Sequence, residues 1–489
     1  MASSSNAWLL IIPGLLIGLI FGCIPGLQTS LAMALVLPAT MTMDLMSAIF
    51  LLTAVFTGSM FGGGISAILM NIPGTSSAVA TAFDGYPMTR RGEHGEALGL
   101  ALAASAIGTM LGYLVLLIVI APLAGFVLKL GPTEMFIVVL WGLTLIAGLD
   151  SGSVARGILA GAFGLLIGTV GMSSNGVIRG TLGVPELLDG IAIVPAMIGM
   201  FAASELFSLK GNSYIVAEGS ARRVSIGSIA KGALQVLRYP GVILRGGLLG
   251  VLVGAVPGVG SSISNLVSYK WEKGRKAVPG ERKFGEGNPR GLVASESANS
   301  SSEGGSMVSL FALGIPGGAG TAILLAAFNM HNITGGPRFL RDHGDIVYAV
   351  IAANIVQAIA LFFVGFLALQ LLGAVVRLRM SWIRPSVLIL AALGSYGIIG
   401  TMQGPLTLLA FALLGWLMKR YGYSVPAMVI GLLLARMAEG ELLRSYQISG
   451  GNFSYVLDRP ITLVMAALLL LSLMVPFLRK RLTASKAAA

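Results

Sequence analysis

Apolar runs separated by short polar loops make up almost the whole sequence, a pattern typical of a chain that crosses a membrane many times. A helix needs about 20 apolar residues to cross a bilayer. The pattern therefore predicts an all-α polytopic membrane protein with roughly eleven or twelve transmembrane spans plus re-entrant helical hairpins. The uninterrupted runs lie near residues 45–61, 97–121, 134–149, 155–172, 187–207, 346–376, 385–401, 404–418, 424–437 and 461–478.

Other apolar runs are interrupted by Pro-Gly pairs, at Pro25-Gly26, Pro73-Gly74, Pro257-Gly258 and Pro316-Gly317. Proline removes a backbone donor and clashes with the preceding turn, and glycine disfavours a helix, so each pair should break its helix. Unpaired backbone groups at membrane depth persist only within protein or beside a wet cavity, and transporters hold solutes at such breaks. A kinked helix with a structural bend is the alternative. For Pro73-Gly74 we expect a re-entrant hairpin that begins at Gly62 and follows a separate span, 45–61.

The interruptions occur in the same order in both halves of the chain. The stretch that begins at Gly14 resembles the one that begins at Gly246, and Ile72-Pro73-Gly74 aligns with Ile315-Pro316-Gly317. Two ordered motifs at nearly one spacing indicate a duplication. We therefore expect a first repeat over 1–207, a basic cytoplasmic linker over 208–240, and a second repeat with C-terminal spans over 241–489.

Charge changes the picture in two ways. Of the 489 residues, 55% are hydrophobic and 11% charged, and the net charge of +12 comes from Lys and Arg in short loops, which indicates the positive-inside pattern and no nucleic-acid partner. The hairpin at Pro25-Gly26 has neutral flanks, whereas the one at Pro257-Gly258 has basic flanks. The two halves should therefore be inverted, with the C-terminus cytoplasmic. In the linker, the mildly amphipathic stretch 224–237 should lie on the membrane surface.

Few residues suit metal or redox chemistry. One cysteine and three histidines exclude an internal disulfide and make a zinc site improbable, so no cofactor is expected. Residues 292–305 are polar, although they align with an apolar span of the first half, and they include Glu296. Ionisable groups within a membrane mark ion or substrate paths. The alternative is that this stretch continues the preceding cytoplasmic loop.

Hydroxyl and amide side chains follow each break and so open the next half-helix. The first N–H groups of a helix lack partners and favour anions, although a single hydroxyl there can simply be a cap. These positions predict a substrate site for a small multivalent anion, and amide and carboxylate oxygens predict a cation site. The substrate-binding candidates are Pro25, Gly26, Gln28, Thr29, Pro73, Gly74, Thr75, Ser76, Pro257, Gly258, Ser261, Ser262, Pro316 and Gly317; the cation-binding candidates are Asn71, Asn265, Glu296 and Asn299.

These motifs together resemble the large membrane subunit of the tripartite tricarboxylate transporters, over nearly the whole chain. The similarity rests on Gly22-x-x-Pro25-Gly26, the run from Gly62 to Thr75, Asp84-Gly85-Tyr86-Pro87-Met88, the run from Gly287 to Asn299, and Leu313-Gly314-Ile315-Pro316-Gly317. The resemblance implies a carrier in the bacterial inner membrane that takes up di- or tricarboxylates along a Na⁺ or H⁺ gradient. It also implies a small membrane subunit and a periplasmic solute-binding protein as partners. The sequence departs from the family pattern at Ser300 and Gly318.

Other functions remain open at this stage. A stand-alone carboxylate exchanger would need no binding protein, and a channel or a homo-oligomer is compatible with the sequence. An intramembrane enzyme would use Glu296 and Asp84, but acid–base catalysis needs two groups within hydrogen-bond reach, and nothing in the sequence pairs these two. No phosphate-binding loop of the ATPase type occurs in the chain, which argues against coupling to ATP within it.

Overall fold

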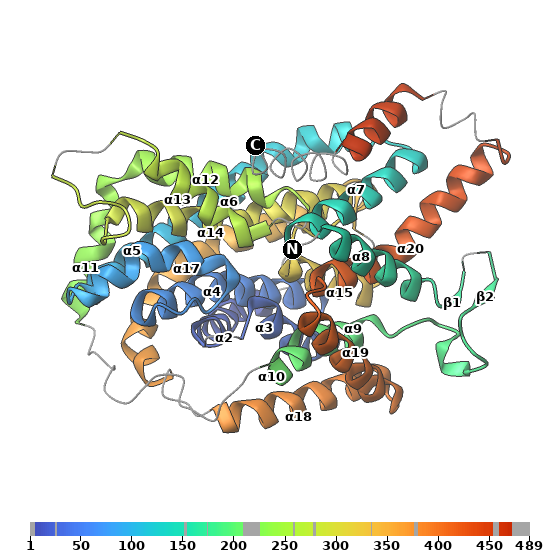
Figure 1. Ribbon diagram of the computed structural model, residues 1–489, viewed down its shortest axis with the longest axis horizontal. Coiled ribbons are helices and arrows are strands. Elements are labelled where there is room, and N and C mark those ends of the chain that lie inside the picture. Colours follow the sequence, from blue (N-terminus) through green and yellow to red (C-terminus); the bar gives the residue numbers. More distant parts are fainter. Residues whose placement is uncertain are drawn as a thin grey trace, which may run out of the picture.

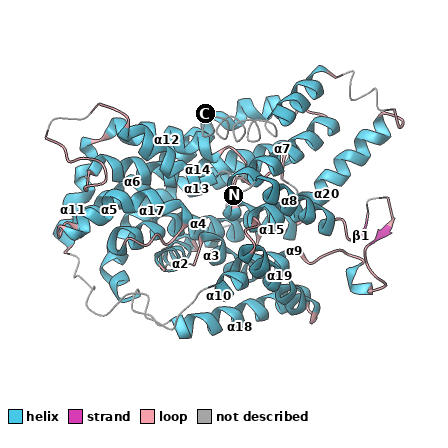
Figure 2. Cartoon of the chain, in the orientation of Figure 1, coloured by secondary structure: helices cyan, strands magenta, loops and turns pink. Residues whose placement is uncertain are grey.

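The computed structural model describes residues 5–24, 27–150, 154–173, 175–208, 225–257, 260–276, 280–333, 335–375, 380–452 and 459–471. Within these residues the chain is almost entirely helical, and the strands β1 (Gly171–Met172) and β2 (Ile178–Arg179) form a small antiparallel hairpin (Figure 2). The prediction of an all-α polytopic membrane protein is confirmed. Among the described residues, four helices are long and apolar enough to cross a membrane, and a bent pair makes a fifth candidate.

The described residues form helices α1 to α20 in chain order (Figure 1). The first half contains α1 (Ser5–Leu9), α2 (Ile11–Cys23), α3 (Thr29–Val36), α4 (Leu45–Met70), α5 (Val79–Arg90), α6 (His94–Val127), α7 (Pro132–Asp150), α8 (Val154–Gly168), α9 (Ile193–Met197) and α10 (Ser204–Ser208). The second half contains α11 (Ile226–Gln235), α12 (Pro240–Gly254), α13 (Gly260–Lys273), α14 (Pro289–Leu313), α15 (Ala319–Met330), α16 (Pro337–Asp342), α17 (Gly344–Val375), α18 (Met380–Ile399), α19 (Gln403–Arg420) and α20 (Val425–Ile448).

Helix α4 is one continuous helix of 26 residues, so the separate span at 45–61 was wrong. The glycines at 62–64 stay helical within tight packing: a side chain at Gly62 would press on the carbonyl oxygen of Leu19 in α2, one at Gly63 on Thr75, and one at Gly64 on Glu296. Helix α4 ends at Asn71, which adopts a left-handed conformation with φ 60°. Close packing has overridden the weak helix propensity of glycine.

After Asn71 the chain turns back along α4 and then runs forward again as α5. The Gly74 N–H donates to the Gly63 carbonyl at 3.1 Å, which places the return beside the middle of α4. The Thr89 hydroxyl, at the end of α5, donates to the Ile68 carbonyl at 2.7 Å, near the end of α4. The break at Pro73-Gly74 therefore exists, as an extended return between two helices that run in the same direction.

The second half repeats this arrangement around α14. This helix of 25 residues also ends on a left-handed residue, Gly314 with φ 70°. The return brings Gly317 against Ser306, and α15 then runs forward until Gly335 lies against Gly314. Residues 292–305 belong to this buried helix, so the alternative that they continue a cytoplasmic loop was wrong.

Helices α4 and α14 cross the centre of the molecule side by side and antiparallel. Thr57 meets Glu303, Met60 meets Asn299, and Gly64 lies against Glu296, so residue numbers rise along one helix as they fall along the other. The equivalent helices of the two halves thus run in opposite directions, as an inverted repeat requires. Which side of the membrane each end faces stays a prediction.

Small residues let the helices around this crossing approach closely. Gly18 and Gly22 of α2 lie against the backbone of α4, where a side chain would overlap carbonyl oxygens of Val55 and Ser59. On the other side, α14 lies between α6 and α12, and its small residues face glycines of both. Close backbone approach at small residues is the usual packing of helices in membranes.

The remaining helices form further groups. Helices α7, α8 and α20 pack together, as do α18, α19 and the α9–α10 segment. The predicted span 155–172 ends at Gly168 and the span 187–207 begins only at Ile193, because a loop with the β-hairpin joins them. Within the predicted linker 208–240, α11 packs on α6 and meets α12 at an angle of 83°; residues 209–224 lie outside the described residues.

Candidate functional site

Beside the middle of α4, the break at Pro73-Gly74 meets residues that flank Pro25-Gly26. The Ser76 N–H donates to the side-chain oxygen of Gln28 at 3.2 Å, which joins the start of α5 to the hairpin between α2 and α3. Gly74 lies so close to Gly22 that a side chain there would overlap the Gly22 carbonyl oxygen. The return after α4 therefore fits directly against the end of α2 and against Gln28.

The two breaks of the second half also meet. Gly317 packs against Ser306 and near the carbonyl oxygen of Gly254, at the end of α12. A Cβ added to Gly142 of α7 would lie 3.0 Å from Ile315 and 3.7 Å from Pro257. Both breaks of this half thus lie together, against α7.

Polar groups from both halves form an amide cluster between these breaks, made of Met60, Ser77, Asn265 and Asn299. The Asn265 amide N–H donates to the Ser77 carbonyl, and that of Asn299 donates to the Met60 carbonyl at 3.1 Å. The Ser77 hydroxyl lies 3.8 Å from the Met60 sulfur, so the two residues that accept these bonds are also in contact with each other.

The side-chain oxygens of Asn265 and Asn299 are fully buried and have no hydrogen-bond partner among the described residues. Buried polar atoms are nearly always satisfied, so these two oxygens are available to accept from a water molecule or to bind a cation. Amide and carbonyl oxygens are ligands that hard cations prefer. The amide cluster can therefore hold Na⁺.

Two fully buried carboxylates flank this cluster on α14. Glu296 accepts hydrogen bonds from the hydroxyls of Thr81 and Ser105, the latter at 2.7 Å, and also bonds with Asn299. Glu303 accepts from Thr57 at 2.8 Å and from Tyr113 at 2.8 Å. The two glutamates lie two helical turns apart, on the same face of α14.

Neither carboxylate forms an ion pair with any residue that the structure describes. An isolated charge is very costly to bury, and a few neutral hydroxyl donors offset only part of that cost. Glu296 and Glu303 can therefore stay in this environment when each carries a proton or lies beside a bound cation. This is the chemistry expected of groups that couple transport to an ion gradient.

A known protein family matches most of this chain. The model of the family described as "Tripartite tricarboxylate transporter TctA family" matches residues 8–430. The chain belongs to this family. It is therefore related to membrane subunits of tricarboxylate transporters, and the resemblance found in the sequence is confirmed.

Two relatives from Agrobacterium vitis show how far the similarity of this TctA-family chain extends. An uncharacterised 52.8 kDa protein in the TAR-I ttuC' 3' region is 31% identical over 450 residues, which are 92% of this chain and 88% of the relative. An uncharacterised protein in the TAR-II ttuC' 3' region is 27% identical over 212 residues, 43% of this chain and 87% of the relative. No solved structure matches the chain.

The structure brings together only part of the substrate-binding candidates. Ser76 is exposed, and Gln28, Pro73 and Pro257 are half-buried. Thr75 is buried and its hydroxyl pairs with Ser77 at 2.9 Å, while Thr29 pairs with Ser59, and Gly74, Pro316 and Gly317 are buried in the breaks. Pro25, Gly26 and Gly258 lie outside the described residues, as do the side chains of Ser261 and Ser262 on α13.

Three of the four cation-binding candidates meet at the centre. Asn265, Glu296 and Asn299 lie there together, whereas Asn71 is exposed at the end of α4, about two turns beyond Gly64. Sequence reasoning missed the partners Thr57, Thr81, Ser105 and Tyr113, and did not assign Glu303 a role. The spacing of seven residues between the two glutamates was the signal for Glu303.

Asp84 has a structural partner of its own. One of its carboxylate oxygens accepts three backbone N–H bonds of 2.8–2.9 Å, from Gly285, Gly287 and Asn288, in the loop that leads into α14. It thereby holds α5 to the start of α14. Because Asp84 is engaged with this loop and Glu296 with other hydroxyls, and because TctA proteins are a transporter family, the interpretation as an enzyme has no support from the site.

Proposed function

We propose that this TctA-family subunit imports di- or tricarboxylates across the bacterial inner membrane, driven by a Na⁺ or H⁺ gradient. A small membrane subunit and a periplasmic solute-binding protein are its partners in this proposal, with the carboxylate delivered by the latter. Membership of a tripartite transporter family supports the partners and the substrate class. The C-terminus is cytoplasmic in this arrangement, by the positive-inside pattern of the loops.

The observation that carries the proposal is the amide cluster with its two buried carboxylates, at the meeting point of the broken helices. In our proposal the cation binds at Asn265, Asn299 and Glu296, and Glu303 responds to the same ion or to a proton. The substrate binds next to them, where the exposed Ser76 opens the short helical segment that leads into α5. A cation beside an anion then lets both cross the low-dielectric interior at lower cost than either alone.

The packing of the helices supports a proposal for which part of the protein moves during transport. Helices α2 to α5 and α12 to α15 pack closely around the antiparallel crossing, whereas α7, α8 and α20 form a separate group. Carriers built from repeated, broken helices expose a central site alternately to the two sides by moving one group of helices against another. We propose that α2 to α5 and α12 to α15 move together relative to α7, α8 and α20. This movement is unfavourable while Glu296 and Glu303 are ionised and no cation is bound.

The test is carboxylate uptake into right-side-out vesicles that contain the complete transporter, with Na⁺ and proton gradients imposed separately. Accumulation should follow one of the two gradients. Glu296→Gln and Glu303→Gln keep the shape of each side chain but remove its ionisation, so gradient-driven accumulation should fall at least tenfold. Glu186→Gln, at an exposed glutamate, is the control. Uptake that ignores both gradients in the unaltered protein would refute the coupling.

A stand-alone carboxylate exchanger is the second candidate. The same vesicles separate it from the tripartite carrier, because an exchanger works without the binding protein and needs carboxylate on the opposite side. Uptake that requires both the binding protein and the small subunit, with no counter-substrate, supports the tripartite carrier.

A further inference from the structure

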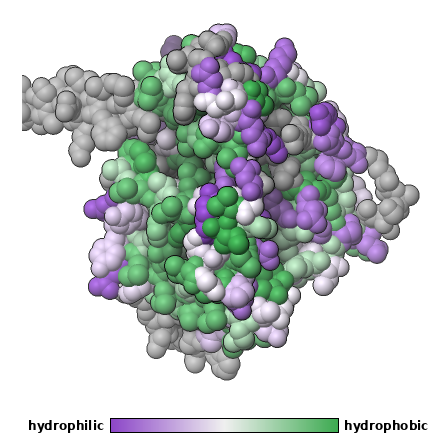
Figure 3. All heavy atoms as spheres, turned by 90° about the vertical axis from the view of Figure 1, so that its right-hand side faces the viewer, coloured by the Kyte–Doolittle hydropathy of each residue, from purple (hydrophilic) through white to green (hydrophobic). Residues whose placement is uncertain are grey.

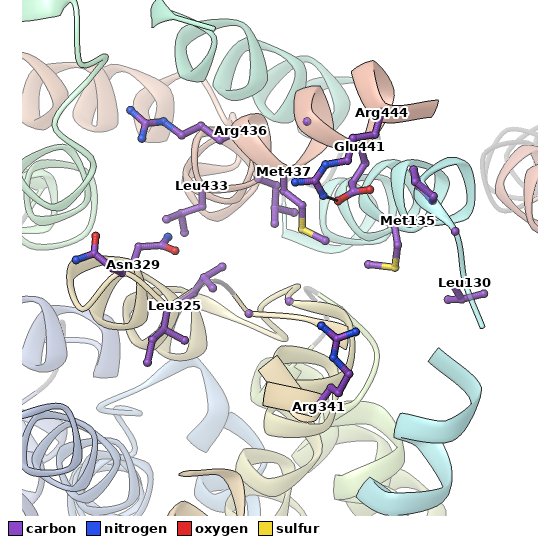
Figure 4. A pocket seen from close by; sticks show the side chains of 18 of the residues that line it. Leu130, Met135, Leu325, Asn329, Arg341, Leu433, Arg436, Met437, Glu441 and Arg444 are labelled. Carbon is purple, nitrogen blue, oxygen red and sulfur yellow. Dashed lines mark hydrogen bonds and ion pairs between the residues drawn. The ribbon is translucent and has the colours of Figure 1, made fainter. Parts of the chain in front are cut away.

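A cavity of about 630 Å³ lies between the end of the α14–α15 unit and helix α20 (Figure 4). Leu325, Asn329 and Arg341 line it from α15, α16 and the loop between them. Leu433, Met437 and Arg444 of α20 line the facing wall, together with residues around the junction of α6 and α7. Its volume falls within the range of about 300–1,000 Å³ typical of pockets for small molecules.

The lining of this cavity is basic. It contains Arg341, Arg436 and Arg444, and Glu441 is its one acidic residue. Arg341 pairs with its neighbour Asp342 at 2.7 Å and Arg444 pairs with Glu441 at 2.8 Å. Both arginines are largely exposed, and ion pairs of this kind are weak, so an incoming carboxylate can replace the acidic partner.

The cavity lies at the opposite end of α14 from the basic loop 270–290. Pro289 begins α14 beside that loop, whereas Gly314, just after the helix, lines the cavity. A helix of 25 residues is about 37 Å long, which is more than the thickness of the hydrocarbon core. If the basic loop is cytoplasmic, the cavity opens on the outer side. The corresponding end of the molecule carries hydrophilic side chains among hydrophobic ones (Figure 3).

The cavity is also next to the breaks. Gly314 lines the cavity, and Ile315, Pro316 and Gly317 follow it directly in the return after α14. An anion held between the two walls is therefore next to the return after α14. Guanidinium groups suit this task because they bind a carboxylate through two parallel hydrogen bonds.

We propose that this cavity is an outer capture site for the substrate, in which Arg341 and Arg444 hold two carboxylates of one di- or tricarboxylate from opposite walls. Arg436 adds positive charge, while its side chain donates to the Asp189 carbonyl at 2.5 Å. This inference rests on the proposed function, since it requires a multivalent carboxylate as the substrate. It adds a first binding step before the central site.

Uptake kinetics test the capture step. The probes are radiolabelled citrate, tartrate and malonate, offered to vesicles with the complete transporter, and any that the unaltered protein accumulates is used for the variants. Arg341→Ala and Arg444→Ala should each raise the apparent KM about three- to tenfold and leave kcat unchanged, since an exposed charge-assisted bond is lost. Arg341→Lys should recover part of the loss.

Arg179→Ala is the matched control, because Arg179 is also exposed and paired, with Glu439 at 2.5 Å, but does not line the cavity. Its KM should stay within twofold of that of the unaltered protein. Unchanged KM in both cavity variants overturns the capture site and leaves the proposed function intact. If the unaltered protein accumulates none of the carboxylates, the proposed function and the capture site fail together.

Thiol labelling tests occupancy independently of transport. The chain's one cysteine, Cys23, is buried, so a Cys23→Ser background carries Met437→Cys inside the cavity or Met402→Cys as an exposed control outside it. A negatively charged thiol reagent should modify the cavity cysteine faster than a positively charged one, and Arg341→Ala should reduce this preference. The transported carboxylate should protect Met437→Cys and not Met402→Cys.

An anionic lipid headgroup shares the chemistry of the substrate, and the labelling separates the two. The measurement is made in vesicles of zwitterionic lipid and again with anionic lipid added. Protection by the soluble carboxylate in both supports the capture site. Protection only by anionic lipid, with none from the carboxylate, assigns the cavity to a headgroup and overturns the proposal.

Discussion

Replacing Tyr113 by Phe should make Glu303 hold a coupling proton more tightly and release it more slowly. The Tyr113 hydroxyl is fully buried and donates to Glu303 at 2.8 Å, and phenylalanine fills nearly the same volume. A hydrogen bond to a charged group contributes about 1.5–3 kcal/mol, and one to a neutral group about 0.5–1.5 kcal/mol. The lost bond therefore destabilises ionised Glu303 more than protonated Glu303, whereas a carboxylate beside bound Na⁺ keeps its charge and no such difference arises.

The difference, about 1–1.5 kcal/mol, corresponds to roughly a five- to tenfold change in affinity. In uptake experiments driven by a proton gradient, the proton concentration for half-maximal rate should fall by this factor, and the maximal rate should fall as release slows. Uptake is measured against Na⁺ concentration and against pH, at matched expression. Tyr348→Phe, at an exposed tyrosine of α17, is the control. A half-saturating proton concentration that does not change, or that rises, would refute the role of Glu303 in proton coupling.

Three further predictions test the packing around the site. Gly74→Ala should abolish uptake or prevent folding, because the added Cβ would overlap the Gly22 carbonyl oxygen. Gly125→Ala is the control, since there is open space around Gly125, and it should be normal in uptake and in size-exclusion chromatography. Asp84→Asn weakens three backbone bonds to the loop before α14, so trypsin should cut at Lys283 several-fold faster than in the Asp345→Asn control; equal rates would contradict this. In whole cells, Met41→Cys should react with an impermeant thiol reagent and Lys283→Cys should not; labelling of both would contradict the inverted topology.

The breaks could be predicted from the sequence because proline and glycine act locally. Both returns begin close to where the Pro-Gly pairs lie, after Asn71 and after Leu313. The predicted start of the first break, at Gly62, was wrong. The prediction gave the glycines at 62–64 the weak helix propensity of an isolated glycine. In the folded protein Gly62 lies against α2, Gly63 against Thr75 and Gly64 against Glu296, and this tertiary packing outweighs a propensity of about 1 kcal/mol per residue.

The candidate site was predicted in part, for a related reason. Glu296 and Asn299 stood out because polar residues interrupt an otherwise apolar region. Their partners did not, since Thr81, Ser105 and Tyr113 each lie in apolar helices about 190 residues or more away in sequence, where a single hydroxyl is unremarkable. These groups come to one place because α5 and α6 pack against α14. The serines of α14 also have a second role, as small residues that let α6 and α12 approach.

The glycine contacts between α2 and α4 have a consequence for how this protein can change over evolution. Where backbone touches backbone, any added side chain forces the two helices apart, so positions such as Gly18 and Gly22 tolerate almost no replacement. The exposed residue Ser76 and the half-buried Gln28 meet no such barrier. Substitutions that change substrate preference are therefore expected at the helix breaks, whereas the glycine contacts between α2 and α4 have to be kept.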